Sequence, residues 1–210
     1  MFPIQKGFNQ PMAMNLIELD QQLMQLINNQ WSSGPLDRFF VELTVLGAWP
    51  VILIALAVLT HRDRRTFWRH ALVMLIVGLL VVFPVRRQMK RVIDRERPGK
   101  TMLSEHGVTV RQLEQKAGSR RSFPSGHTVM AFYTLTYASL ARRKLATPLL
   151  LLATAIAYSR VYVGAHYPGD CLAGAILGAG GAYLAWRVFI WSEKRASNQV
   201  ACCTQPHNNT

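Results

Sequence analysis

Residues 170–191, DCLAGAILGAGGAYLAWRVFIW, decide the architecture of this chain of 210 residues. The segment is apolar over the length of about 20 residues that an α-helix needs to cross a bilayer. Gly174, Gly178 and Ala182 recur at four-residue spacing and therefore lie on one face of the predicted helix. Small residues on one face let helix backbones approach closely in lipid, so we predict that this stripe packs against another membrane helix.

Four other apolar segments precede this one, at residues 39–60, 71–85, 127–140 and 146–165. Residues 15–31, NLIELDQQLMQLINNQW, have apolar residues at roughly helical spacing but are too polar to span. We predict an amphipathic helix at the membrane interface there, with an ordinary soluble packing helix as the alternative. The expected fold class is all-α, a polytopic membrane helix bundle with about five transmembrane helices plus an N-terminal interfacial amphipathic helix.

The composition fits one membrane domain. Half of the residues are hydrophobic and the formal net charge is +13, which favours binding to anions at a membrane surface. No nucleic-acid-reading motif is present, so we expect no nucleic-acid partner. The three cysteines have no metal-ligand spacing, and the first twenty residues lack the apolar core of a cleaved signal. We divide the chain into an N-terminal segment (1–35), a transmembrane domain (36–192) and a polar tail (193–210).

The loops indicate an orientation. With five spans, the basic loops at 61–70 and 142–144 and the tail share one side, which the positive-inside tendency makes cytoplasmic. The other side carries eleven Lys and Arg between Arg86 and Arg121, and a simple count of charges would reverse the topology. We keep the first orientation because a bound phosphate would explain several of those cations. In either orientation, three stretches that carry histidines or charged residues lie on the same side of the membrane.

The first stretch is KRVIDRERP, residues 90–98. Lys90 and Arg97 are seven residues apart, so on a helix they project from the same face and could hold one phosphate. Pro98 would end that helix, because the residue before proline disfavours the helical conformation. The alternative is a basic stretch whose side chains reach toward anionic headgroups.

The second stretch is PSGH, residues 124–127, at the start of an apolar helix. Ser125 is a natural N-cap, and Gly126 lets backbone N–H groups approach an anion at the positive end of the helix dipole. His127 would lie in the first turn and could donate a proton to a leaving oxygen. The alternative is an ordinary cap followed by an interfacial histidine.

The third stretch is SRVYVGAHYPGD, residues 159–170. Arg160 lies near the end of a span, where an arginine side chain raises the free energy of the protein in the membrane unless it pairs with another group or faces water. Asp170 follows His166 by four residues, and a nearby carboxylate can fix the tautomer of an imidazole and raise its nucleophilicity. We therefore predict His166 as a nucleophile. The alternatives are an interfacial histidine and an Asp170 that simply caps the last span.

Together the three stretches resemble the signature of the type 2 phosphatidic acid phosphatase superfamily, which includes bacterial acid phosphatases and vanadium haloperoxidases. The first motif of that family is a lysine, six residues and Arg-Pro, which Lys90, Arg97 and Pro98 match. PSGH at 124–127 is the second motif, unchanged. The third motif, Ser-Arg, five residues, His, three residues and Asp, is matched by Ser159, Arg160, His166 and Asp170.

The resemblance implies a two-step phosphoryl transfer that needs neither a metal nor a cofactor. His166 would attack phosphorus and form a phosphohistidine, and Asp170 would orient it. His127 would protonate the leaving group and then activate a water molecule. The resemblance implies that the residues holding the phosphate are Lys90, Arg97, Ser125, Gly126 and Arg160.

The membrane spans favour a lipid phosphatase, with a phosphorylated lipid and the bilayer as partners and no defined oligomeric state. We expect undecaprenyl diphosphate as substrate, because the chain is short and the loop at 99–123 is compact. Phosphatidylglycerophosphate, phosphatidate and lipid A 1-phosphate are alternatives, as is a lipid phosphotransferase. A non-catalytic protein that binds anionic lipids would not need both histidines and Asp170. The expected location is the bacterial inner membrane, with the site facing the periplasm or outside.

Overall fold

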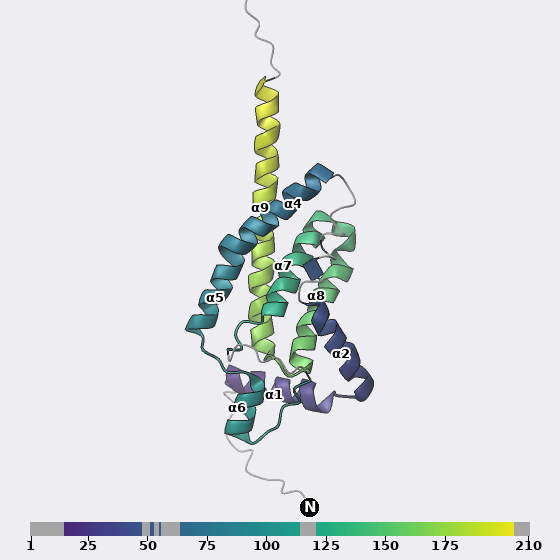
Figure 1. Cartoon of the computed structure of the whole chain (residues 1–210), viewed down its shortest axis with the longest axis vertical. Coiled ribbons are helices and arrows are strands. Elements are labelled where there is room, and N and C mark those ends of the chain that lie inside the picture. The colour runs from purple at the N-terminus through teal and green to yellow at the C-terminus, as the bar shows by residue number, and fades with distance from the viewer. Residues whose placement is uncertain (1–14, 48–50, 53–54, 56–63, 114–120, 204–210) are drawn as a thin grey trace, which may run out of the picture.

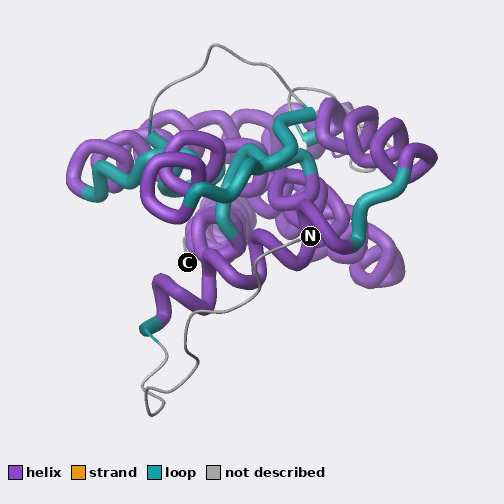
Figure 2. The backbone as a smooth tube through the Cα atoms, turned by 90° about the horizontal axis from the view of Figure 1, so that it is seen from below, coloured by secondary structure: helices purple, strands orange, loops and turns teal. Residues whose placement is uncertain are grey.

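The computed structural model describes residues 15–47, 51–52, 55, 64–113 and 121–203. Within these ranges the chain forms helices and loops and no strand (Figure 2). The all-α prediction is therefore confirmed. The described helices are α1 (Leu16–Gln25), η1 (Leu26–Gln30), α2 (Gly34–Leu46), α4 (Arg64–Val77), η2 (Gly78–Val82), α5 (Phe83–Val92), α6 (Pro98–His106), α7 (Gly126–Ala141), η3 (Arg143–Leu145), α8 (Ala146–Tyr162) and α9 (Pro168–Cys203).

Helix α7 is the centre of the bundle and packs against both α8 and α9 (Figure 1). One face joins a core with α2 and α8 that includes Leu43, Leu135 and Ile156. Another face joins a core with α4, η2 and α9 that includes Tyr133 and Ala182. Because α7 is buried on several sides, its position determines where its N-terminal turn, with the PSGH stretch, lies.

The small-residue stripe of α9 lies directly against α7. A Cβ added at Gly174 would lie 2.9 Å from the carbonyl oxygen of Ser125. A Cβ added at Gly178 would lie 2.5 Å from the carbonyl oxygen of Val129, which is closer than real Cβ contacts allow. Ala182 is fully buried. The predicted packing of the stripe is confirmed, and it brings the N-terminal turns of α7 and α9 side by side.

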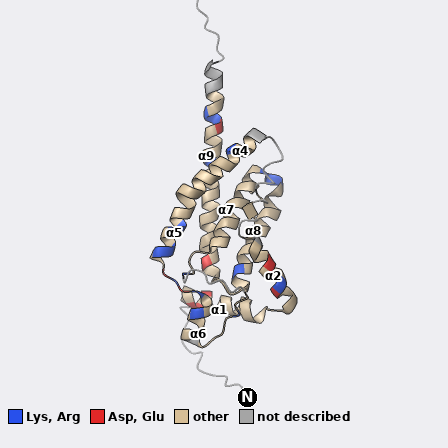
Figure 3. Cartoon of the chain, in the orientation of Figure 1, with Lys and Arg blue, Asp and Glu red and all other residues tan. Residues whose placement is uncertain are grey.

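Three helical segments among the described residues are long and apolar enough to cross a membrane: Thr66–Val92, Arg143–Tyr162 and Pro168–Asn198. They overlap the predicted segments at 71–85, 146–165 and 170–191. The segment at 127–140 forms α7, a helix of 16 residues. Much of the segment at 39–60 lies outside the described residues. The middle of the bundle is mostly uncharged, and charged side chains gather nearer its ends (Figure 3).

Three of the predicted helix ends are wrong. The last helix continues past Trp191 and ends at Cys203, whereas two others end earlier than predicted. The helix at 146–165 ends at Tyr162, because Gly164 adopts a positive φ of 81° that starts a turn. The basic helix does not continue to Pro98 but ends at Val92, and Ile93 leaves the helical conformation. Backbone contacts explain this second break, since the N–H of Ser122 donates to the carbonyl of Arg95 at 2.7 Å.

The N-terminal helix predicted at 15–31 is confirmed as α1 and η1. Leu16, Ile17 and Leu23 are exposed, as expected of a helix at a membrane interface. Met24 and Asn28 are buried, and α1 packs against α6 and α9. One face is therefore packed as in a soluble helix and the other is exposed, and the location of the exposed face at the membrane interface stays a prediction.

Asn28 connects this N-terminal region to the rest of the fold. Its amide nitrogen donates to the carbonyls of Tyr162 at 2.7 Å and of Arg111 at 3.0 Å. The N–H of Arg111 donates back to the Asn28 side-chain oxygen at 2.9 Å, and the Arg111 guanidinium pairs with Asp37. These contacts hold the segment before residue 113 against the end of α8.

The contact between α7 and α9 leads to a stability prediction. We expect Gly178→Ala to lower the free energy of unfolding by about 1–3 kcal/mol, because the new methyl group meets backbone atoms that cannot move aside cheaply. Gly180→Ala is the matched control, since a Cβ there meets nothing within 4 Å. Thermal unfolding in detergent measures both variants. Equal melting temperatures for the two would contradict the close α7–α9 contact.

Candidate active site

The three motif stretches meet at one end of the bundle, where α7 and α9 begin and α8 ends (Figure 1). The N–H of Ser125 donates to the carbonyl of Asp170 at 3.1 Å, which joins the second stretch to the third. The hydrogen bond from Ser122 to the Arg95 carbonyl brings the first stretch to the same place. The predicted gathering of these stretches is confirmed.

His166 lies in the tight turn between α8 and α9. The N–H groups of Ala165 and His166 both donate to the carbonyl of Arg160, at 3.1 and 3.2 Å, so the turn folds back on the helix end. Gly164 is required here, because its φ is positive and an added Cβ would lie 2.4 Å from the carbonyl oxygen of Arg111. The turn therefore directs the His166 side chain inward, and only 4% of it is exposed.

The imidazole of His166 is held on its Nδ1 side. Nδ1 lies 3.3 Å from the hydroxyl oxygen of Ser122 and 3.6 Å from Oδ2 of Asp170. Burial lowers the pKa of His166 to about 4, although the Asp170 carboxylate acts in the opposite direction. The ring is therefore neutral at physiological pH. With Nδ1 facing Ser122 and Asp170, Nε2 is the nitrogen available for chemistry.

Asp170 has no exposed side-chain surface. Both oxygens of its carboxylate have hydrogen-bonding or ion-pair partners. Oδ2 accepts hydrogen bonds from the Ser122 hydroxyl and, at 3.0 Å, from the N–H of Tyr167. Oδ1 pairs with Arg95 at 3.0 Å. Since α9 begins at Pro168, Asp170 is in its first turn and its carboxylate reaches back to the N–H of the cap residue Tyr167. Asp170 is therefore not itself the N-cap, which rejects the alternative of a plain cap.

Lys90 and Arg97 do not share a helical face, which corrects the sequence-based geometry. Lys90 is in the last turn of α5, whereas Arg97 is the extended N-cap of α6, beyond the break at Ile93. Both still lie at the site. The charges that act on Lys90 include Arg97 and Asp170, and the charge of Arg97 also acts on His166. The two cations therefore reach the site from separate elements.

The other predicted phosphate-binding groups flank the same region. Arg160 is 2% exposed, and its guanidinium donates to the hydroxyl of Thr44 on α2. Ser125 is at the N-cap of α7 as predicted, but its Oγ accepts a hydrogen bond from the Thr128 hydroxyl at 3.0 Å and makes no capping bond. Gly126 begins the helix, so its N–H is one of those that the helix leaves without an internal partner.

Arg86 contacts the PSGH turn, and this contact was not predicted from the sequence. A Cβ added at Gly126 would lie 2.5 Å from Nη2 of Arg86, so the guanidinium lies directly against Gly126 and would have to shift if this residue had a side chain. Arg86 is four residues before Lys90 on α5, and its charge acts on Lys90. A cation beside the positive end of a helix favours an anion at this position.

His127 is in the first turn of α7, as predicted, and is partly buried. The C-terminal end of α2 packs against it, since a Cβ added at Gly47 would lie 3.3 Å from the His127 Cβ. Its role as an acid toward the leaving group stays a prediction. Among the described residues, no group of three or more His, Cys, Asp and Glu side chains could hold a metal ion.

Two contacts of the site were not predicted from the sequence. Ser122 holds both His166 and Asp170, and Arg95 pairs with Asp170. Arg95 lies within the first motif stretch, but the sequence predicts no contact of it with Asp170. No local pattern marks Ser122, because its role depends on a contact 48 residues away in the chain.

Comparisons with known proteins agree with this geometry. Residues 66–194 match the PAP2 superfamily, and this range contains all three stretches. The undecaprenyl-diphosphatase-like protein YbjG of Escherichia coli is 30% identical over 78% of this chain and 79% of its own length. The lipid A 4'-phosphatase of Bacteroides thetaiotaomicron is 29% identical over 80% of this chain and 76% of its own.

The solved structures include a protein with a similar fold. The crystal structure of LpxE from Aquifex aeolicus superposes with a TM-score of 0.61 and 29% identity, covering 84% of this chain and 96% of that one. The family match covers more than half of the chain, and its range includes His127, His166 and Asp170. This protein is therefore an integral membrane member of the PAP2 superfamily, whose relatives are lipid phosphatases.

Proposed function

We propose that the protein hydrolyses a phosphorylated lipid through a phosphohistidine on His166. The observation that carries this proposal is the buried, neutral imidazole of His166, held on its Nδ1 side beside Asp170. A neutral imidazole has a lone pair to attack with, and the carboxylate stabilises the positive charge that the ring gains. Relatives that are lipid phosphatases support the same reaction class.

The reaction has two balanced steps. In the first, Nε2 of His166 attacks phosphorus, the bond from phosphorus to the leaving oxygen breaks, and His127 gives that oxygen a proton. In the second, His127 takes a proton from water, the oxygen attacks phosphorus, and the phosphorus–nitrogen bond breaks to release phosphate. Neither step requires a metal ion, and cationic side chains neutralise the charge that develops.

The phosphate is held by groups from several elements. Lys90 and Arg97 approach from the two sides of the α5–α6 connection, and Arg160 approaches from α8. Ser125 and the Gly126 N–H add neutral donors at the start of α7. We add Arg86 to this set, because its guanidinium lies against Gly126. Groups on separate elements can surround a phosphate, whereas a single helical face could not.

A groove beside the site supports a lipid substrate. Its volume is about 1020 Å³, and it lies between α1, the α5–α6 connection and the start of α9. Its walls are largely apolar and include Leu16, Leu23, Phe123 and Leu172. Leu16 and Leu172 are 81% and 64% exposed, so the groove opens onto surface suited to hydrocarbon chains.

We propose undecaprenyl diphosphate as the substrate. The similarity to YbjG and the shortness of the sequence at 99–123 support this choice. The similarity to a lipid A 4'-phosphatase makes lipid A phosphates an alternative substrate. Phosphatidylglycerophosphate and phosphatidate are further alternatives. Transfer of the phosphoryl group to a second lipid instead of water would use the same phosphohistidine.

We propose that the site faces the periplasm, in the inner membrane of a bacterium. The basic residues at 61–70 and the C-terminal part of α9, with Lys194 and Arg195, would then lie in the cytoplasm. A reporter fused after residue 195 tests this orientation and should give a cytoplasmic signal. A periplasmic signal would reverse it.

The nucleophile leads to a direct prediction. We expect His166→Ala to lower the release of phosphate from lipid substrates by about 10⁴-fold or more, as loss of a nucleophile does in other enzymes. Turnover of the unmodified protein should continue in EDTA, and vanadate should inhibit it. The assay measures inorganic phosphate in detergent. Undiminished turnover in the variant, or full dependence on added metal, would contradict the mechanism.

The pH dependence of the unmodified enzyme tests the same assignment. Because the pKa of His166 is lowered to about 4, the imidazole stays neutral and nucleophilic as the pH falls toward that value. On the acid side, the ratio kcat/KM, corrected for ionisation of the substrate, should therefore stay high until the pH drops through about 4. An acid limb near 6.5, the ordinary value for histidine, would show a solvated nucleophile.

The substrate choice predicts an order of preference. With purified protein, kcat/KM for undecaprenyl diphosphate should exceed that for phosphatidate, phosphatidylglycerophosphate and lipid A by about tenfold or more, equivalent to about 1.4 kcal/mol. An acceptor lipid in parallel reactions distinguishes hydrolysis from transfer. Preference for another lipid would overturn the substrate, and phosphorylated acceptor in place of free phosphate would overturn hydrolysis.

A further inference from the structure

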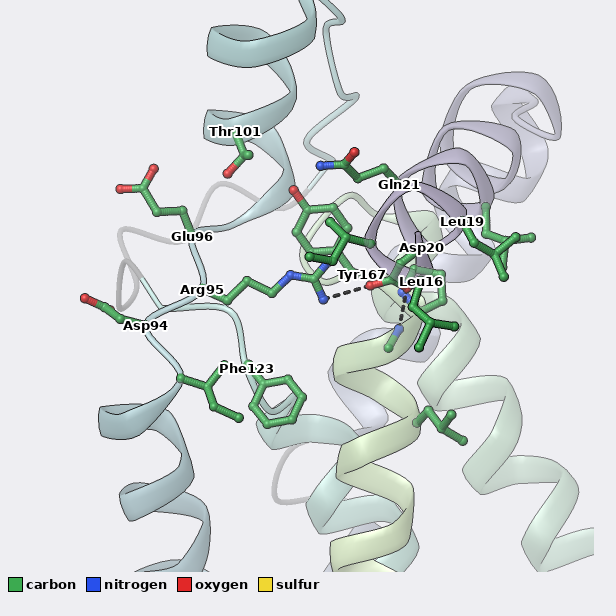
Figure 4. A pocket seen from close by; sticks show the side chains of 16 residues that line it. Leu16, Leu19, Asp20, Gln21, Asp94, Arg95, Glu96, Thr101, Phe123 and Tyr167 are labelled. Atoms are coloured by element: carbon green, nitrogen blue, oxygen red, sulfur yellow. Dashed lines mark hydrogen bonds and ion pairs between the residues drawn. The ribbon is translucent and has the colours of Figure 1, made fainter. Parts of the chain in front are cut away.

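Arg95 makes contacts that the proposed mechanism does not use. It lies in the connection between α5 and α6, and its Nη1 is 3.0 Å from Oδ1 of Asp170 and 2.7 Å from Oδ2 of Asp20. The guanidinium carbon lies 3.8 Å from the ring centre of Tyr167, the neighbour of His166 (Figure 4). One guanidinium therefore joins the carboxylate beside the proposed nucleophile to a carboxylate of the N-terminal helix.

Asp20 is the second half of this arrangement. It lies on α1, and its Oδ1 accepts a hydrogen bond from the N–H of Gly169 at 2.6 Å (Figure 4). The side chain is 13% exposed, so it faces the protein, whereas Leu16 and Ile17 of the same helix are largely exposed. Asp20 thus holds Arg95 and the first turn of α9 together, from a helix that lies far away in the sequence.

We infer that Arg95 and Asp20 are positioning residues that fix the Asp170 carboxylate against His166, and that α1 is thereby part of the active site. This inference rests on the proposed function. Asp170 can orient the imidazole only if its own two oxygens are fixed, and Ser122 and the Tyr167 N–H act on Oδ2 alone. Arg95 supplies the contact to Oδ1.

The contacts of Arg95 separate it from the cations that would hold phosphate. Its Nη1 already faces two carboxylates, and its flat face lies on Tyr167. A planar guanidinium can make both kinds of contact at once, whereas a lysine ammonium can pair but cannot stack in this way. Arg95 also lines the groove proposed for the lipid, but its charged group is turned to Asp20 and Asp170. Loss of Arg95 should therefore act mainly on the rate of the chemical step and only weakly on the binding of substrate.

The test compares kcat and KM in four variants. We expect Arg95→Met to lower kcat by about 100-fold, the size of effect expected when reacting groups shift by about 1 Å, with KM within about twofold of the unmodified protein. Arg95→Lys should recover part of kcat. Asp20→Asn, which keeps an oxygen for the Gly169 N–H, should lower kcat by about tenfold. The double variant Arg95→Met with Asp20→Asn should be no slower than Arg95→Met alone, because Asp20 acts through Arg95.

Arg91→Met is the matched control, since it removes an exposed cation four residues before Arg95 in the sequence and should keep kcat. If Arg95→Met does not fold, the kcat and KM values of Asp20→Asn and Arg95→Lys provide the test. An unchanged kcat, a rise in KM in place of the fall in kcat, or additive losses in the double variant would each overturn the inference. His166→Ala is assayed beside them, because full activity there would instead show that the proposed function fails.

Discussion

The burial of the Asp170 carboxylate is the constraint on which the rest of the site depends. A carboxylate with no exposed surface is stable only when hydrogen bonds and a cation compensate for lost solvation. Ser122, Tyr167 and Arg95 supply these partners, and each comes from a different part of the chain. Because all three partners contact the one carboxylate, the loop before α7, the turn after α8 and the α5–α6 connection come together around Asp170. His166 lies within this set, beside Ser122 and Asp170.

The close contact of α7 with α9 makes this arrangement possible. Without side chains at Gly174 and Gly178, the two helices approach until backbone atoms nearly touch, and their first turns become neighbours. One of these turns carries Asp170 and the other carries Ser125, Gly126 and His127. A packing feature that is common in membrane helices thus places a carboxylate beside a helix N-terminus suited to phosphate.

The sequence predicted the parts of the molecule that depend on local pattern. The α7–α9 stripe, the N-terminal amphipathic helix and the meeting of the three stretches are all present in the structure. The shared helical face of Lys90 and Arg97 was wrong, because backbone contacts to residues 121 and 122 interrupt the helix after Val92. Ser122 and Arg95 were missed for the same reason. Their roles come from contacts between distant segments, which spacing along the chain does not encode.

The basic segment between Arg86 and Arg121 has two different tasks. Arg95 pairs with Asp20 and Asp170, Arg111 with Asp37, Arg121 with Asp94 and Lys100 with Glu96. These four cations hold the connections around the site, so they compensate carboxylates of the protein itself. Lys90 and Arg86 differ, since neither forms an ion pair with a described residue; the charge of Arg86 acts on Lys90, and the Arg86 guanidinium lies against Gly126. Cations in such an arrangement repel one another, and a bound phosphate would relieve that repulsion. The same charges that make the substrate-free site less stable thereby favour binding of the phosphate.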